Sequence, residues 1–110
     1  MENEKTNAQM RKGVLEYCIL LILKQRKSYV PDLIDLLKQS KMVVVEGTLY
    51  PLLMRLKNSG YLGYEWQEST SGPPRKYYFI TPEGESFLLE LDASWRELEE
   101  TIHQLKTLNN

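Results

Sequence analysis

The chain has 110 residues, 42% of them apolar, with a single cysteine and a single histidine. This length corresponds to one small domain, and a domain of this size often gains stability by dimerising. The cysteine and histidine counts exclude an internal disulfide and leave almost no ligands for a metal site, so we expect no metal and no cofactor.

The formal net charge of −1 is the sum of two unlike parts. Residues 1–80 hold 12 Lys and Arg against 8 Asp and Glu, a balance of +4, and residues 81–110 hold 2 against 7, a balance of −5. The first part is suited to a polyanion such as nucleic acid, which would repel the acidic second part. A plainer interpretation, compatible with the first, is that residues 81–110 form a solvated helix with glutamates on its outer side.

Two helices are predicted in the first half of the chain. The first, from about Met10 to Gln25, is apolar on most sides. Such a helix is buried on more than one face, so we expect one face in the core and another against a second subunit. The second helix begins near Pro31, whose missing N–H has no partner in a first turn anyway, and runs to about Ser40. Residues 42–45 form a β-branched run that we interpret as a third, minor strand.

The first helix contains the apolar run Val14–Leu23, which is interrupted by Glu16 and is too short to span a bilayer. No secretory signal is visible in the sequence. These observations predict a soluble, cytoplasmic protein with no membrane partner. Cys18 lies within the run, where we expect a buried, unreactive thiol.

Pro51 constrains the third predicted helix, because a proline deep inside a helix breaks it. The helix is therefore expected to begin near Gly47, with Thr48 as its N-cap and Pro51 in the first turn, and to end at Gly60 as its C-cap. Leucines recur at i, i+3, i+4 and i+7, which predicts one buried face made of Leu49, Leu52, Leu53 and Leu56. The other side presents Thr48, Tyr50, Met54, Arg55, Lys57 and Asn58.

Two aromatic-rich segments, 61–67 and 75–80, are predicted to be strands. The loop between them contains Pro73 and Pro74, which fix its backbone. The segment Thr81-Pro82-Glu83 then supplies a cap residue, a proline at the first helical position and an acid near the positive end of the helix dipole. A long final helix is therefore predicted to begin there.

The order helix, helix, helix, strand, loop, strand, helix is typical of a winged helix-turn-helix. We therefore predict a mainly α (α+β) fold, with a winged-helix DNA-binding domain over residues 1–80 and a C-terminal dimerisation helix over residues 81–110. In a helix-turn-helix the second helix of the motif enters the major groove. That position falls to the predicted helix 48–59.

The predicted DNA-binding residues are Thr48, Tyr50, Arg55, Lys57, Lys41, Arg75 and Lys76. Arginine matches the two major-groove acceptors of guanine, whereas lysine is better suited to phosphate. The basic pair beside the loop can reach the minor groove or its phosphates. Taken singly, residues such as Arg55 and Lys57 are more often solvated helix charges, and residues such as 77–79 more often build a core. The prediction therefore depends on the combination of register, wing and charge.

Residues 46–84 contain three specific motifs. They are Glu46-Gly47-Thr48-Leu49-Tyr50-Pro51, the following Leu-x-x-Leu-x-x-x-Gly-Tyr-Leu phrase, and Gly72-Pro73-Pro74-Arg75-Lys76-Tyr77-Tyr78 with its continuation Phe79-Ile80-Thr81-Pro82-Glu83-Gly84. Together they resemble the PadR family of transcriptional regulators, and the resemblance runs from about residue 10 to the end of the chain. It implies a dimeric winged-helix repressor of the small subclass with a single C-terminal helix. It also implies that Thr48 and Tyr50 belong to the recognition helix and Arg75-Lys76 to the wing.

The final helix carries a row of apolar residues at alternating spacings of 3 and 4, which we call the C-terminal seam: Leu88, Leu91, Trp95, Leu98, Ile102 and Leu105. This heptad pattern predicts burial against another helix. An isologous two-fold dimer is the simplest solution, and it would match two recognition helices to half-sites about one DNA turn apart.

Trp95 in the middle of the C-terminal seam has two interpretations. It is either a packing residue at the dimer contact or the wall of an effector site, where two symmetry-related indoles would stack on a flat aromatic molecule. The resemblance adds that drug-sensing PadR-like repressors carry a tryptophan on this helix, in a context similar to Ser94-Trp95, lining a pore between subunits. Other members of the family respond to phenolic acids.

These observations predict a homodimeric transcriptional repressor that binds a pseudo-palindromic operator in double-stranded DNA. Its expected effector is a small aromatic molecule, such as a planar one, or an amphipathic molecule. The alternative is a winged-helix protein–protein adaptor without DNA binding, which the positive balance of residues 1–80 and the basic wing argue against. No enzymatic activity is expected, because the sole histidine, His103, has no cysteine or serine motif around it.

Overall fold

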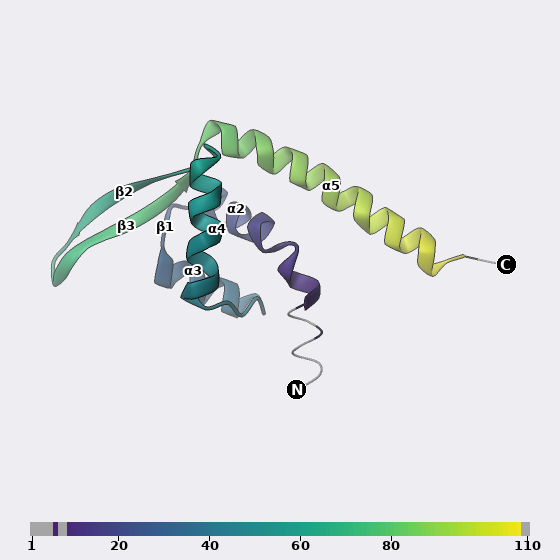
Figure 1. Cartoon of the computed structure of the whole chain (residues 1–110), viewed down its shortest axis with the longest axis horizontal. Helices are drawn as coiled ribbons and strands as arrows, with labels where there is room; N and C mark the ends of the chain where they lie inside the picture. Colours follow the sequence, from purple (N-terminus) through teal and green to yellow (C-terminus); the bar gives the residue numbers. More distant parts are fainter. Residues whose placement is uncertain (1–5, 7–8, 109–110) are drawn as a thin grey trace.

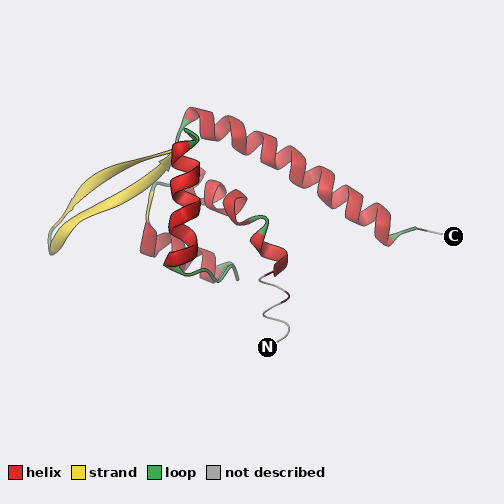
Figure 2. Ribbon diagram, in the orientation of Figure 1, coloured by secondary structure: helices red, strands yellow, loops and turns green. Residues whose placement is uncertain are grey.

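The computed structural model describes Thr6 and residues 9–108. Its elements, in chain order, are α2 (Leu15–Gln25), β1 (Ser28–Tyr29), α3 (Val30–Gln39), α4 (Glu46–Asn58), β2 (Leu62–Ser69), β3 (Gly72–Ile80) and α5 (Pro82–Lys106). Helices α2, α3 and α4 pack together, and the β2–β3 hairpin and α5 leave them in opposite directions (Figures 1 and 2). The predicted winged helix-turn-helix with a long C-terminal helix is thereby confirmed.

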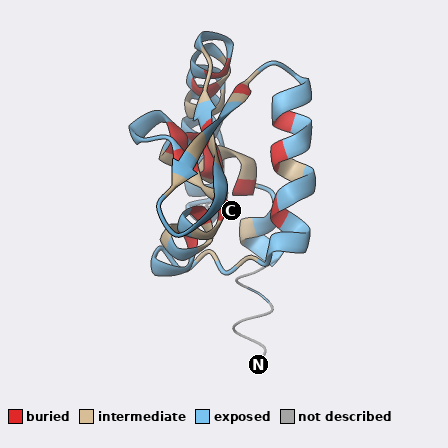
Figure 3. Cartoon of the chain, turned by 90° about the vertical axis from the view of Figure 1, so that its left-hand side faces the viewer, coloured by how far each residue is buried: buried red, intermediate tan, exposed pale blue. Residues whose placement is uncertain are grey.

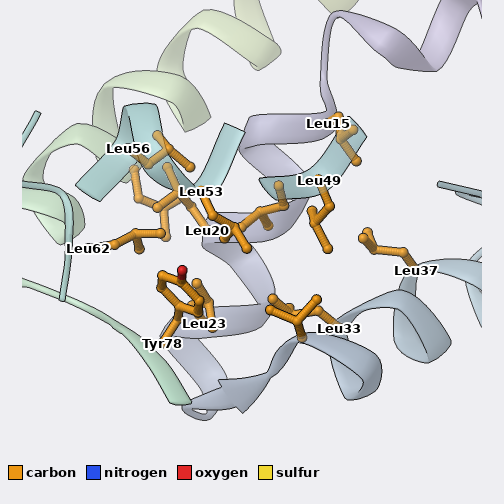
Figure 4. Close-up of a cluster of buried hydrophobic side chains, with 13 residues drawn as sticks. Leu15, Leu20, Leu23, Leu33, Leu37, Leu49, Leu53, Leu56, Leu62 and Tyr78 are labelled. Carbon is orange, nitrogen blue, oxygen red and sulfur yellow. The ribbon is translucent and has the colours of Figure 1, made fainter. Parts of the chain in front are cut away.

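A leucine-rich core lies between the three helices and the sheet (Figure 4). Its largest fully buried side chains are Ile19, Leu20, Leu33, Leu37, Leu49 and Leu53. Leu56 is also buried and Leu52 is half-buried, so the leucine face predicted for the third helix is confirmed. Burial of a leucine side chain contributes about 1.5–3 kcal/mol, which makes these helices interdependent.

Helix α2 is shorter than the sequence predicts. Residues 9–12 are helical, but a turn at Gly13 and Val14 separates them from α2, since glycine weakens a helix interior. The buried side of α2 faces the core, while Leu21 is exposed and Cys18 is only half-buried. This leaves apolar surface on the other side of α2, as expected for a helix that is apolar nearly all round. Burial raises the pKa of the Cys18 thiol.

The third helix begins close to Gly47 as predicted, but its predicted N-cap was wrong. Helix α4 begins at Glu46 with Val45 as its N-cap residue, and no side chain caps it, so Thr48 lies inside the helix rather than at its N-cap. Pro51 therefore also lies inside the helix, where it cannot donate to the carbonyl of Gly47. Both residues are exposed, so water can satisfy this carbonyl and the helix continues past the proline.

The predicted end of the same helix at Gly60 is confirmed. Gly60 has a φ of 85°, in the left-handed region that glycine adopts without strain. Its N–H donates to the carbonyl of Lys57 at 2.9 Å, and the N–H of Tyr61 donates to the carbonyl of Leu56 at 3.0 Å. This pair of bonds is the Schellman arrangement that closes a helix C-terminus.

The third strand is not where the sequence predicts it. The sheet has the order β1-β3-β2 and is antiparallel, with Ser28 opposite Tyr78 and Tyr29 opposite Tyr77. Because β1 occupies this edge of β3, residues 42–45 form a loop instead of a strand. In that loop Met42 and Val44 pack against the core while Val43 and Val45 are exposed.

A tight junction joins the end of α4 to the start of α5. Thr81 caps α5 as predicted, because its hydroxyl accepts from the N–H of Gly84 at 3.0 Å and donates to the carbonyl of Gly60 at 2.6 Å. Gly84 is buried, and a Cβ there would collide with the carbonyl oxygen of Tyr61 and lie 2.7 Å from the Ile80 side chain. The rings of Tyr61 and Phe87 stack at 4.2 Å beside this contact.

We predict that Gly84→Ala lowers the free energy of unfolding by at least about 1–3 kcal/mol, because the added methyl has no space against the Tyr61 backbone. The matched control is Gly47→Ala, where no atom lies within 4 Å of the added carbon. That change is expected to stabilise the protein by about 0.4–1 kcal/mol, as in other exposed helical sites. Urea unfolding followed by circular dichroism measures both, and equal effects would contradict the prediction.

Candidate nucleic-acid interface

Helix α4 lies at the surface with one long exposed side (Figure 3). That side contains Thr48, Tyr50, Met54, Arg55, Lys57 and Asn58, all of them exposed as the sequence predicts. The leucines of the same helix point into the core, which holds the exposed residues in fixed directions. On one flank of α4 these side chains face the hairpin, and on the other flank they face α2. The predicted site therefore has two parts.

One flank of α4 faces the hairpin. Tyr50 lies there, 47% exposed, and burial together with the nearby carboxylate of Glu46 raises the pKa of its hydroxyl. The charge of Lys76 acts on the same hydroxyl and lowers its pKa by a smaller amount. Tyr50 is therefore a protonated hydrogen-bond donor at neutral pH, placed between α4 and the wing.

Lys57 of α4 and Lys76 of β3 meet over a single aromatic ring. The ammonium of Lys57 lies 5.3 Å from the centroid of Tyr64 in β2, and that of Lys76 lies 4.0 Å from it. Cation–π attraction holds both side chains in place. The structure thus brings Lys57 and Lys76 to the same ring at the junction of helix and wing, and Tyr50 lies close enough to Lys76 for that charge to act on its hydroxyl.

Arg55 lies on the opposite flank and is not free. Its guanidinium forms an ion pair with Glu16 of α2, and the paired oxygen of Glu16 is buried. A buried carboxylate oxygen without its partner is costly, so Arg55 has a structural role in joining α4 to α2. About two-thirds of its side chain is still exposed, at 65%, so one edge of the guanidinium remains available.

Lys41 and Arg75 lie apart from the other predicted residues. Lys41 has a φ of 64° and ends α3 with the same pair of backbone bonds that Gly60 makes at the end of α4, so its backbone position is strained for a non-glycine residue. Arg75 lies 5.1 Å from the ring of Tyr29 in β1. It is on the other face of the hairpin from Lys76, because neighbouring residues of a strand alternate.

Sequence reasoning missed three residues of this surface: Glu16, Tyr64 and Trp66. The partnership of Glu16 with Arg55 joins residues 39 positions apart and leaves no local signal. Tyr64 and Trp66 did leave a local signal. Their spacing of two along β2 places both on one face of the hairpin, opposite Tyr78 and Lys76 of β3. The aromatic pair that holds Lys76 was therefore readable from strand register.

The C-terminal seam is divided between two environments. Leu88 is 2% exposed and packs in the core, and Leu91 is half-buried against it. From Trp95 onward the seam is exposed, because α5 extends beyond the helices it contacts (Figure 1). The exposed members are Trp95, Leu98, Ile102 and Leu105.

Trp95 lies at the point where α5 leaves the body of the molecule. It is 38% exposed, and its ring lies 6.3 Å from that of Tyr17 in α2. The Tyr17 hydroxyl donates a hydrogen bond to the carboxylate of Asp92, one turn before Trp95. This bond, together with burial and the charge of Asp92, raises the pKa of Tyr17 to about 12. The contact ties α5 to α2 directly beside the proposed effector residue.

Comparison with known proteins identifies the family. The family model of the PadR-like transcriptional regulators matches residues 19–90. The chain belongs to the PadR-like family. It is 59% identical to a PadR-like transcription factor from Bacteroides fragilis, with a TM-score of 0.77 over 92% of this chain and 98% of that one.

Two further solved PadR-family regulators are similar over nearly the whole chain. One from Bacillus cereus is 39% identical, with a TM-score of 0.79 over 92% of this chain and 99% of that one. One from Eggerthella lenta is 34% identical, with a TM-score of 0.82 over 96% of this chain and 92% of that one. The resemblance seen in the motifs of residues 46–84 is therefore confirmed.

Membership in the PadR family implies a transcriptional regulator that binds DNA, rather than an enzyme. The matched region includes α4, the wing and the junction at Gly84, and it ends before Trp95. Among the described residues, no cluster of side chains is suited to holding a metal ion. No helix in the described ranges is long and apolar enough to cross a membrane.

Proposed function

We propose that this PadR-family regulator is a homodimeric repressor of a pseudo-palindromic operator, with α4 as its recognition helix, and that a small planar aromatic effector releases it from DNA. The main support is the convergence of Tyr50, Lys57 and Lys76 at the junction of α4 and the wing. A hydroxyl donor and two cations near this junction are the kinds of group that direct base readout combined with phosphate contact requires. Selection of bound fragments from genomic DNA with the purified protein tests this and identifies the operator.

The rival function is a protein–protein adaptor that has a winged helix but binds no DNA. Such an adaptor would not need two lysines directed over one ring, and its binding to duplex DNA would be absent at every salt concentration. A DNA-binding regulator instead loses affinity steeply with added salt, because each neutralised phosphate releases counterions. A mobility-shift titration at several salt concentrations separates the two.

We predict that Tyr50→Ala weakens operator binding about five- to 150-fold, the equivalent of about 1–3 kcal/mol for one base contact. Arg55→Ala is expected to weaken binding as well, but it also leaves the buried oxygen of Glu16 unpaired and so lowers stability. The matched control is Glu16→Gln, which releases the guanidinium while keeping the shape of the side chain. Operator affinity measured by mobility shift, with thermal unfolding in parallel, distinguishes the roles. Wild-type affinity in Tyr50→Ala would argue against α4 as the recognition helix.

The dimer is supported by the apolar surfaces that the single chain leaves uncovered. The outer seam residues Leu98, Ile102 and Leu105 are exposed, and Trp95 is partly exposed beside Tyr17. Helix α2 adds an exposed Leu21 and a half-buried Ile22. An amphipathic helix in water must bury its apolar side, and a second copy offers the same surfaces in return. The first heptad is already used internally, since Leu88 is buried in its own core.

We predict that Leu98→Glu converts the dimer to a monomer, because a charge on the seam cannot be buried without a partner. Ala93→Glu is the matched control, since it adds the same charge to the same helix on the side away from the seam. Light scattering measures the mass of both variants. A Leu98→Glu protein that remains dimeric, or an Ala93→Glu protein that dissociates, would place the interface elsewhere.

The effector site is supported by the position of Trp95. Its indole is partly exposed beside Tyr17, and a two-fold axis along the seam would bring a second copy near. Stacking on a flat ligand adds about 0.5–1.5 kcal/mol per aromatic pair beyond burial. A ligand that wedges between the two α5 helices would favour one dimer arrangement over another and so alter the spacing of the recognition helices.

We predict that planar aromatic compounds quench the fluorescence of Trp95 and lower operator affinity. The measurement uses a Trp66→Phe background, in which Trp95 is the sole tryptophan. In that background Trp95→Ala is expected to abolish ligand binding, as measured by calorimetry, while its affinity for DNA is retained. If a broad panel of planar aromatics leaves fluorescence and operator affinity unchanged, Trp95 is a packing residue only.

A further inference from the structure

The face of the hairpin that continues from the core carries an unusual group of side chains. Residues opposite each other in antiparallel strands share a face, and the register pairs Tyr64 with Tyr78 and Trp66 with Lys76. This face therefore holds three aromatic rings and one lysine. The other face carries Arg75 and Tyr77, together with Tyr29 of β1. The two cations of the wing therefore belong to different surfaces.

Lys76 is held by all three rings of its face. Its ammonium lies 4.0 Å from the centroid of Tyr64, 5.2 Å from that of Tyr78 and 5.9 Å from that of Trp66. Several rings around one ammonium restrict a side chain that is otherwise flexible. The charge is thus fixed on the side of the hairpin that α4 shares, rather than free at the tip.

A second cation reaches the same group from α4. Lys57 lies 5.3 Å from the centroid of Tyr64, so two ammonium groups share one ring. Within the part of the chain that the structure describes, the ion pairs are Lys27 with Glu65 and Arg55 with Glu16, and neither lysine of this group has a carboxylate partner. Two neighbouring uncompensated charges repel each other, and an anion between them would relieve that repulsion.

Trp66 stands at the outer end of the group. Its side chain is 63% exposed, and its ring meets that of Tyr64, 37% exposed, edge to face at 6.3 Å. An indole in this position offers an apolar surface next to the ammonium of Lys76, with Lys57 on the neighbouring Tyr64 ring. A nucleic-acid backbone presents the same two kinds of surface in alternation, with charged phosphates between apolar sugar rings.

We infer that Trp66 is a DNA-contact residue of the wing, whose indole packs on the sugar–phosphate backbone while Lys76 and Lys57 hold the adjacent phosphate. This inference rests on the proposed DNA binding and extends it to residues that the basic motif alone does not indicate. It also gives the two faces of the wing different roles. Lys76 contacts DNA on the face shared with α4, whereas Arg75 on the other face mainly holds β1 in place through Tyr29.

The direct test is fluorescence in a Trp95→Phe background, where Trp66 is the only indole and is left intact. Duplex carrying the selected operator is added, and acrylamide quenching is measured with and without DNA. Contact predicts that bound DNA changes the emission of Trp66 and protects it from acrylamide. An unchanged spectrum and unchanged acrylamide quenching at a DNA concentration that saturates the mobility shift would overturn the inference. Absence of any mobility shift would instead mean that the proposed function itself has failed.

Matched substitutions then test the asymmetry. Trp66→Ala is expected to weaken binding about tenfold without changing its salt dependence, since an aromatic contact carries no charge. Lys76→Gln is expected to lower the slope of log affinity against log salt by about 1, whereas Arg75→Gln leaves that slope unchanged. Thermal unfolding of each variant measures the contribution to hairpin stability. Equal slopes for the two glutamine variants would contradict the assignment of Lys76 and Arg75 to different surfaces.

Discussion

The contact between the backbone of Gly84 and the carbonyl of Tyr61 holds α4, the wing and α5 together. Tyr61 follows the glycine that ends α4 and precedes β2, while Gly84 lies in the first turn of α5. Thr81 closes the same junction through its hydrogen bonds to Gly60 and Gly84. Because the backbones touch without an intervening side chain, the three elements are held close together at this point.

The junction also explains how an almost neutral chain can approach a polyanion. The hairpin and α5 leave the body in opposite directions (Figure 1), so the acidic residues of α5 extend away from the surface formed by Lys57 and Lys76. Charges separated by more than about 10 Å are largely screened at ordinary ionic strength. The net charge of −1 is therefore a poor guide to the local field at α4.

Local patterns in the sequence predicted most of the fold, and contacts between distant residues account for what was missed. The spacing of Leu49, Leu53 and Leu56, the glycine at position 60 and the cap at Thr81 each act within one or two helical turns, and each was read correctly. The pairing of β1 with β3 and the ion pair of Arg55 with Glu16 depend on tertiary packing, which leaves no periodic signal. The N-cap of α4 was misplaced because Pro51 was expected to lie in the first turn, whereas the helix begins at Glu46 and continues past the proline.

Because α5 is long, a small change of its angle at the junction displaces its far end by several ångströms. At a rise of 1.5 Å per residue, its 25 residues span about 38 Å, so a tilt of about 5° at Gly84 displaces the far end by about 3 Å. The hydrogen bond from Tyr17 to Asp92 ties the first part of α5 to α2, and the rest of α5 projects beyond it (Figure 1). A given tilt of the helix at Gly84 would therefore move Trp95 little and the helix tip much more.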